Sequence, residues 1–227
     1  MKIRSILTDA ERQRVSNGVT AAETESAGEI LTILTTQSDS YADVALAWSA
    51  LVALLALSAL TIAPGFYFGI YEALSGGWLH AWTPRAVFAL ALTVTALKFG
   101  AMWLLQLWMP LRLALVPGPV KAMRVRRRAV TCFRVGAERR THGRTGVLIY
   151  LSRREHRAEI VADEAIAAKV PPEVWGDVMA EMIALIREDR VADGLCAAVE
   201  RVGAILADHF PRADDDRNEL PDRLIEV

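Results

Sequence analysis

Carboxylates near the ends of predicted strands are the residues of this chain best suited to chemistry: Asp39, Asp43, Asp163 and Glu164, with Glu159 beside them. Carboxylate oxygens are the ligands that Ca²⁺ and Mg²⁺ prefer, so these residues are candidate ligands of a divalent cation. Acidic side chains are also common at strand ends because water solvates them there. A cation site and a set of solvated charges therefore remain alternative interpretations.

Motifs of well-characterised enzyme classes do not accompany these acids. The chain has no phosphate-binding loop, no Gly-x-Ser-x-Gly, no His-Glu-x-x-His and no dinucleotide-binding fingerprint. Its four histidines are scattered, and Cys132 and Cys196 lack metal-ligand spacing. The sequence therefore predicts no catalytic residue and no organic cofactor, and it does not decide whether the protein is an enzyme.

Two apolar runs explain why 53% of the residues are hydrophobic and the mean hydropathy is +0.25. Residues 44–63 contain no charge, and residues 86–109 contain one. At a rise of about 1.5 Å per residue, each run as a helix is about 30 Å long or more, which matches the hydrocarbon core of a bilayer. We expect a transmembrane hairpin over 44–109, joined by the short aromatic outside loop 64–85. This composition argues against a fully soluble protein and excludes a disordered chain.

Basic residues predict which way the hairpin faces. The loop 64–85 carries one, Arg85, whereas the segment 110–128 carries six. Because Lys and Arg are retained on the cytoplasmic side, both flanks and both termini are predicted to be cytoplasmic. Most of these residues also suit contact with anionic lipid headgroups, and no nucleic acid partner is expected. They are Lys121, Arg124, Arg126, Arg127 and Arg128.

The single charge within the second span, Lys98, is a separate intramembrane candidate. A charge inside the hydrocarbon core is costly and often marks a functional site. Lysine can also extend its long side chain to the membrane surface and have no further role, which is the simpler interpretation. Alternatively, Lys98 faces a partner helix, since the first span contains no acidic residue that could pair with it.

The remaining residues predict one split α/β domain in the cytoplasm, formed by 1–43 and 110–211, with an acidic, extended or mobile tail at 212–227. Thr8 and Glu11 form a capping box that starts a helix ending near residue 24. Apolar, β-branched runs predict strands, and apolar residues at helical spacing predict helices. Strands are expected at 30–36, 147–151 and 156–163, the last two as a hairpin, and helices at 120–140, 174–186 and 191–206.

The topology of this domain predicts an interaction surface. A long helical crossover joins the first two strands, so they should be parallel and end at the same edge of the sheet. Ligands of open α/β sheets bind at this edge, and here the first strand leads directly into a membrane span, so the edge should face the bilayer. Its residues are Ser38, Asp39, Tyr41, Ser152, Arg153 and Arg154. Ser38, Asp39 and Ser40 are also expected to cap the span.

Several stretches resemble the TPM domain, which is named for a thylakoid lumen protein, a photosystem II repair factor and an acetylcholine-receptor modulator. Residues 7–30, LTDAERQRVSNGVTAAETESAGEI, are similar to its opening helix and strand, and residues 144–175 are similar to its strand hairpin and following helix. GAILADHFP at 203–211 and NELPD at 218–222 resemble a bacterial membrane-protein branch of the family. The resemblance implies a Rossmann-like α/β fold, often tethered to a membrane, and its bacterial branch implies that the membrane here is a bacterial inner membrane.

Two functions follow as hypotheses. The first is a membrane-anchored module that interacts with, or assembles, other membrane proteins at the cytoplasmic face. The second is a divalent-metal-dependent enzyme similar to an acid phosphatase, because the resemblance implies the phosphatase activity and calcium binding attributed to a plant member of the family. The predicted fold class is thus α/β, a Rossmann-like TPM domain interrupted by a two-helix transmembrane hairpin.

Overall fold

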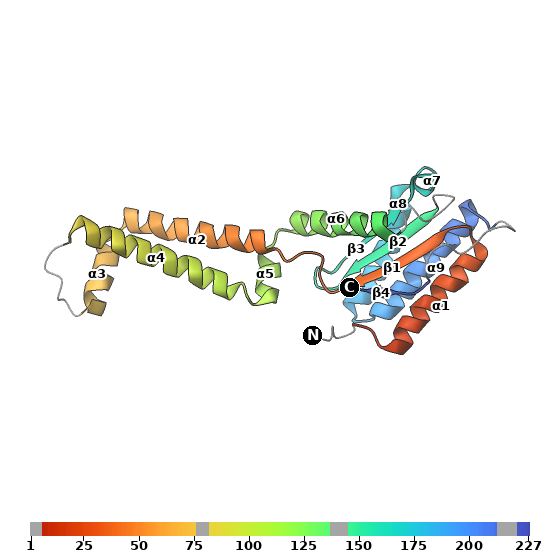
Figure 1. Cartoon of the computed structure of the whole chain (residues 1–227), viewed down its shortest axis with the longest axis horizontal. Helices are drawn as coiled ribbons and strands as arrows, with labels where there is room; N and C mark the ends of the chain where they lie inside the picture. Colours follow the sequence, from red (N-terminus) through yellow and green to blue (C-terminus); the bar gives the residue numbers. More distant parts are fainter. Residues whose placement is uncertain (1–5, 76–81, 137–144, 213–221) are drawn as a thin grey trace. The chain divides into compact units, whose positions relative to one another are not determined.

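The computed structural model describes residues 6–75, 82–136, 145–212 and 222–227. The chain forms two compact units, one from Met1–Asp39 with Gly118–Val227 and one from Ser40–Pro117 (Figure 1). The first unit is mixed α/β, and the described part of the second is helical.

The α/β unit contains the strands and the helices that cover them. Its helices are α1 (Asp9–Glu25), α6 (Gly118–Gly136), α7 (Glu164–Ala167), α8 (Pro172–Arg187) and α9 (Val191–His209). Its strands are β1 (Glu29–Thr35), β2 (Gly146–Ser152), β3 (Arg157–Ala162) and β4 (Ile225–Glu226). The predicted capping box starts α1: the Thr8 hydroxyl accepts from the backbone N–H of Glu11, whose carboxylate accepts from the backbone N–H of Thr8 at 2.8 Å.

The strands form one sheet in the order β3-β2-β1-β4. β1 and β2 are parallel, with Thr35 opposite Ser152, and β3 runs antiparallel to β2. The predicted parallel pair and hairpin are therefore confirmed. The tail was expected to be extended or mobile. Its last residues are extended, since β4 pairs in parallel with β1, and the side chain of Leu224 is buried in the core.

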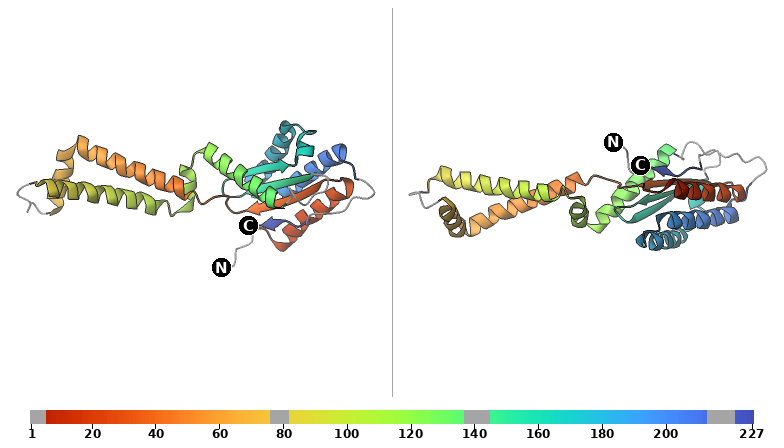
Figure 2. Two further views of the ribbon diagram at one scale, coloured as in Figure 1. Left: turned by 45° about the horizontal axis from the view of Figure 1, so that its top comes forward. Right: turned by 90° about the horizontal axis from the view of Figure 1, so that it is seen from below.

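Helices cover both faces of the sheet, which is why β1 and β2 are buried along their whole length (Figure 2). Alternate residues point to opposite faces, so Ile30 and Leu34 pack toward α1, α8 and α9. Leu31 and Ile33 pack on the other face against Val125, Ala129 and Phe133 of α6. The predicted helix at 120–140 is described as far as Gly136, and residues 137–140 lie outside the described chain.

The helical unit is built around two long helices. Its elements are α2 (Ala42–Ile62), α3 (Pro64–Ser75), α4 (Pro84–Leu105) and α5 (Met109–Leu115). α2 packs along α4, and both helices are long and apolar enough to cross a membrane. The fully buried amide of Gln106 donates hydrogen bonds to the carbonyl oxygen of Ala45 at 3.0 Å and to the hydroxyl of Ser49 at 3.2 Å. These bonds join the end of α4 to the start of α2.

Details of this unit correct the sequence predictions. Part of the expected loop, Pro64–Ser75, is the helix α3, since Pro is well suited to the first position of a helix. The second span was expected to reach residue 109, but α4 ends at Leu105. Pro110 has no N–H to bond the carbonyl oxygen of Gln106, which instead accepts from Nε of Arg112 at 2.8 Å.

The start of α2 also differs from prediction. Tyr41, with φ 52°, is its N-cap residue, and no side chain caps the helix. Ser38, Asp39 and Ser40 therefore do not have the capping role expected of them. The middle of the expected outside loop, residues 76–81, lies outside the described chain.

Candidate functional site

The parallel strands β1 and β2 end side by side, and backbone hydrogen bonds continue past them. The N–H of Arg153 donates to the carbonyl oxygen of Thr35 at 3.0 Å, and that of Arg154 donates to Thr36 at 3.1 Å. This carboxyl edge is where ligands bind in open α/β sheets. The turn between β2 and β3 is thereby fixed against the segment that follows β1.

A buried carboxylate, Glu155, organises this edge. Its side chain accepts a hydrogen bond from the backbone N–H of Ser38 at 2.8 Å and another from the hydroxyl of Ser152. Glu155 is 6% exposed and Ser152 is fully buried. A buried carboxylate requires such donors, because an unpaired charge away from water is costly. The predicted surface residues Ser38 and Ser152 thus meet through a third residue that the sequence prediction did not include.

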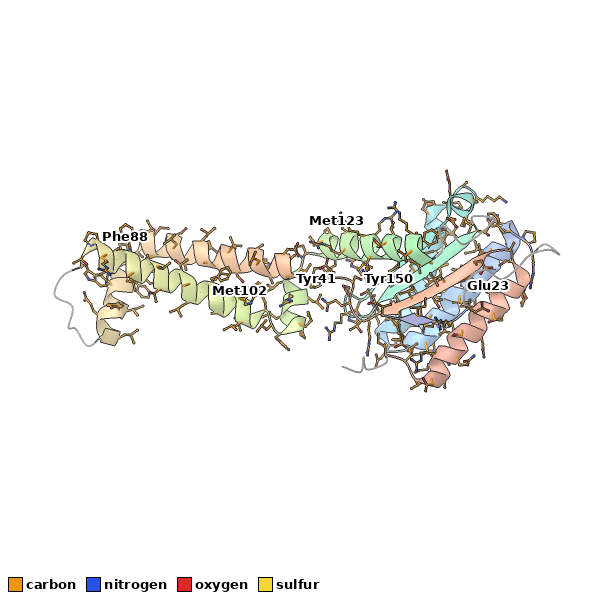
Figure 3. The ribbon with its side chains drawn as sticks, viewed as in Figure 1. Glu23, Tyr41, Phe88, Met102, Met123 and Tyr150 are labelled. Carbon is orange, nitrogen blue, oxygen red and sulfur yellow. The ribbon has the colours of Figure 1, made fainter. Side chains whose placement is uncertain are left out.

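Tyr150 adds a second link on the face of the sheet covered by α6. Its phenol oxygen lies 3.1 Å from the hydroxyl of Ser38. Burial raises the pKa of the Tyr150 phenol, and the hydrogen bond to Ser38 only partly opposes this effect. The phenol therefore stays protonated and serves as a hydrogen-bonding group at this end of the sheet (Figure 3).

Asp39 forms an ion pair with α6. Nη1 of Arg124 lies 2.6 Å from Oδ2 of Asp39, and about a quarter of each side chain is exposed, 23% for Arg124 and 27% for Asp39. Arg124 is therefore less suited than expected to contact lipid headgroups, because its guanidinium pairs with Asp39 inside the α/β unit. Tyr41, the remaining residue of the predicted surface, belongs to the helical unit and is fully buried.

A pocket of about 580 Å³ opens beside these bonds at the same edge of the sheet. Its lining combines basic, apolar, hydroxyl and carboxylate groups. It is lined by Ile6, Thr36, Arg153, Arg154, His156, Ile186, Asp189 and Val191. Nη1 of Arg154 lies 3.2 Å from Oε1 of Gln37, and Nη2 of Arg153 lies 3.4 Å from Oδ1 of Asp189. Both guanidinium groups are exposed, so these contacts compete with water and are weak.

Two residues that line this pocket have a left-handed backbone. His156 has φ 48° and Asp189 has φ 62°. Positive φ is uncommon for residues other than glycine, and such residues concentrate at turns and functional sites. His156 lies in the β2–β3 turn and Asp189 in the connection from α8 to α9, so both turns present side chains to one pocket.

The four carboxylates predicted as cation ligands do not come together. Asp39 follows the carboxyl end of β1, whereas Asp163 lies at the other end of the sheet, where its Oδ2 accepts from the N–H of Gly146 at 3.1 Å. A seven-residue strand separates these ends by about 20 Å. Asp43 lies in the first turn of α2, and Glu164 begins α7. Among the described residues, no group of three His, Cys, Asp or Glu side chains could hold a metal ion.

The predicted lipid-contact residues all belong to α6. Arg126, Arg127 and Arg128 are exposed, and Lys121 is half-buried. Nη1 of Arg126 lies 3.6 Å from the carboxylate of Glu159, whose pKa is raised by burial and lowered in part by this arginine. α6 thus presents basic side chains outward while Val125, Ala129 and Phe133 pack on the sheet.

A second unusual acid, Glu23, lies near the amino end of β1, away from the pocket (Figure 3). Its carboxylate accepts from the N–H of Ile30 at 2.8 Å. Burial, with smaller contributions from Glu29 and Asp222, raises the pKa of Glu23 to about 8. Neither Glu23 nor Glu155 stood out in the sequence, because their burial depends on contacts between distant segments.

Comparison with known proteins agrees with this architecture. Residues 122–205 match the family model of the TPM domain, which confirms the resemblance over this part of the chain. The chain is also similar to the NMR structure of the BA42 protein from the psychrophilic bacterium Bizionia argentinensis, with a TM-score of 0.58 and 18% identity. That match covers 100% of this chain and 99% of the other, and it shows a shared fold. No curated protein matches the chain.

Proposed function

We propose that this TPM-domain protein is anchored in the bacterial inner membrane and docks other membrane proteins at the cytoplasmic face. In this proposal α2 and α4 form the transmembrane hairpin that interrupts a Rossmann-like domain. The pocket at the carboxyl edge of β1 and β2, lined by Arg153, Arg154 and His156, accepts an acidic segment of the partner. The protein acts by binding and positioning that partner.

The pocket is the observation that carries this proposal. It lies at the edge of the sheet where α/β folds bind ligands. Arg153 and Arg154 in its lining belong to the turn whose Glu155 accepts hydrogen bonds from Ser38 and Ser152. Arg153 and Arg154 are held by their backbone N–H groups, which leaves both guanidinium groups at the surface. A site on a preorganised support loses little conformational entropy on binding.

The composition of the pocket favours a peptide as the ligand. Its basic groups suit carboxylates, and Asp189 shows that a carboxylate reaches Arg153. Ile6, Ile186 and Val191 add apolar groups to the lining, which suit the side chains of a peptide better than a small inorganic anion. An acidic segment with interspersed apolar side chains satisfies both parts of the lining.

The exposed arginines of α6 also support a partner at the membrane surface. Arg127 and Arg128 are exposed toward anionic lipid headgroups, and each contact contributes about 1 kcal/mol close to such a surface. Lipid contact through α6 and peptide contact through the pocket use different residues. A partner that is itself in the membrane would meet both.

Binding of a short fluorescent polyglutamate peptide to the intact protein in detergent tests this function. We expect binding that weakens with added salt and falls about two- to fivefold in each of the variants Arg153→Ala and Arg154→Ala, since an exposed ion pair contributes up to about 1 kcal/mol. Arg127→Ala, on the exposed side of α6, is the matched control and should bind as the wild type does.

Equal binding by wild type and both pocket variants would contradict the proposal. So would turnover of p-nitrophenyl phosphate that requires Ca²⁺ or Mg²⁺ and is lost in Asp163→Asn, because that result belongs to the metal-dependent phosphatase. The melting temperature of Arg153→Ala should stay close to that of the wild type, since exposed substitutions usually change stability by less than about 0.5 kcal/mol.

A further inference from the structure

Lys98 belongs to α4, and no residue of α4 lines the proposed pocket. No residue of α4 is fully buried, and the side chain of Lys98 is exposed. Val94, Lys98, Ala101 and Leu105 follow one another at spacings of four, three and four, so they share one side of the helix. This spacing is typical of helix-packing seams, yet Lys98, Ala101 and Leu105 are exposed.

The acids of the helical unit are not placed to pair with Lys98. Glu72 of α3 accepts a hydrogen bond from the indole N–H of Trp82 at 3.0 Å, and Asp43 lies in the first turn of α2. The bond from Gln106 to Ala45 places the start of α2 beside Gln106. Asp43 lies two residues before Ala45 and is therefore about 15 Å from Lys98 along the axis of α4, at about 1.5 Å per residue.

We propose that this side of α4 binds a transmembrane helix of a partner protein, and that this helix carries an Asp or Glu at the depth of Lys98. The inference rests on the proposed function in one respect, that the partner is a membrane protein. An ammonium group within a span is stabilised by pairing with an opposite charge. The small side chain of Ala101, one turn away, lets the partner helix approach closely.

A second copy of this chain does not fit this side of α4. A symmetric pair would bring two Lys98 ammonium groups together, and like charges repel strongly in a medium of low dielectric constant. A lysine that only extends to the membrane surface would leave helix association independent of its charge. Only the acidic partner helix therefore predicts that association requires opposite charges on the two helices.

The test uses the intact protein reconstituted in lipid vesicles with a synthetic leucine–alanine transmembrane peptide. One peptide carries a single Asp near its centre, and the matched control carries Asn. Energy transfer between labelled protein and labelled peptide reports their association. We expect association about tenfold weaker with the Asn peptide or with the variant Lys98→Met, which corresponds to the 1–2 kcal/mol of a polar contact between membrane helices.

A charge-reversed pair shows whether a loss of binding comes from the charge or from misfolding of the variant. Lys98→Glu should fail to bind the Asp peptide but should bind a peptide with Lys at that position. The variant Arg153→Ala should bind the Asp peptide like the wild type. This experiment can therefore refute the inference about Lys98 without refuting the proposed pocket, and the polyglutamate experiment can refute the pocket without refuting the inference. Equal association with the Asp and Asn peptides would overturn the inference, as would self-association of the protein as strong as its binding to the Asp peptide.

Discussion

The backbone N–H of Ser38 donates to the carboxylate of Glu155 at 2.8 Å, across 117 residues of sequence. This bond ties the segment that leaves β1 to the turn that leaves β2. The hydroxyl of Ser152 donates to the same carboxylate, which is buried. The carboxyl edge of the sheet is therefore a single hydrogen-bonded structure, and the exposed arginines of the pocket project from it.

Removal of this carboxylate should loosen the edge. In Glu155→Ala, the N–H of Ser38 and the hydroxyl of Ser152 lose their acceptor, and we expect a loss of about 1–3 kcal/mol in the free energy of unfolding. Asp177→Ala, on the exposed side of α8, is the control and should change stability by less than about 0.5 kcal/mol. Thermal unfolding of the purified protein measures both. Similar melting temperatures for the two variants would mean that Glu155 does not hold the edge.

Glu23 should make stability depend on pH. Its pKa is raised from 4.5 to about 8 in the folded protein, mainly by burial. The folded state thus holds this proton more tightly than the unfolded state, so the contribution is fully present below about pH 4.5 and is lost as the pH rises through about 8. We expect Glu23→Gln, which keeps an acceptor for the N–H of Ile30, to lose less stability than the wild type between pH 5 and 9. The melting temperature of each protein, measured between pH 5 and 9, tests this. The same dependence on pH in both proteins would disprove the raised pKa of Glu23.

Divalent cations should leave the melting temperature unchanged. Asp39 is paired with Arg124, and Asp163 accepts from Gly146 at the opposite end of the sheet. These carboxylates are too far apart to share one ion, since cation–oxygen distances are about 2.0–2.6 Å. Scanning calorimetry with Ca²⁺, Mg²⁺ or a chelator measures this. A rise in melting temperature that EDTA reverses and Asp163→Asn abolishes would show a cation site.

The predicted orientation of the hairpin is also open to measurement. Six basic residues in 110–128 against one in 64–85 predict that both termini are cytoplasmic. Alkaline phosphatase, which is active only in the periplasm, should be active when inserted after Ser75 and inactive when fused after Val227. The opposite pattern would place the α/β unit and its pocket outside the cytoplasm.

The sequence predicted those elements whose signals are local. The Thr8–Glu11 capping box, the apolar, β-branched runs of β1 and β2 and the apolar stripe of α6 all depend on neighbours within a few residues. Glu155 was missed because nothing near it in sequence marks its burial, which arises when Ser38 reaches it from another segment. The left-handed Tyr41, the pairing of β4 with β1 and the separation of Asp39 from Asp163 likewise depend on the assembled sheet and helices.

The central claim, that the pocket at the carboxyl edge of the sheet docks membrane proteins, is tested most directly by site-specific photo-crosslinking in native membranes. A photoreactive amino acid replaces Arg154 in one variant and Asp177 in another, because both positions are exposed but only the first lines the pocket. The account predicts that position 154 crosslinks to a membrane protein through an acidic segment, and that an added Arg153→Ala substitution reduces the yield. Equal yields from positions 154 and 177, or a yield at 154 that Arg153→Ala leaves unchanged, would contradict it.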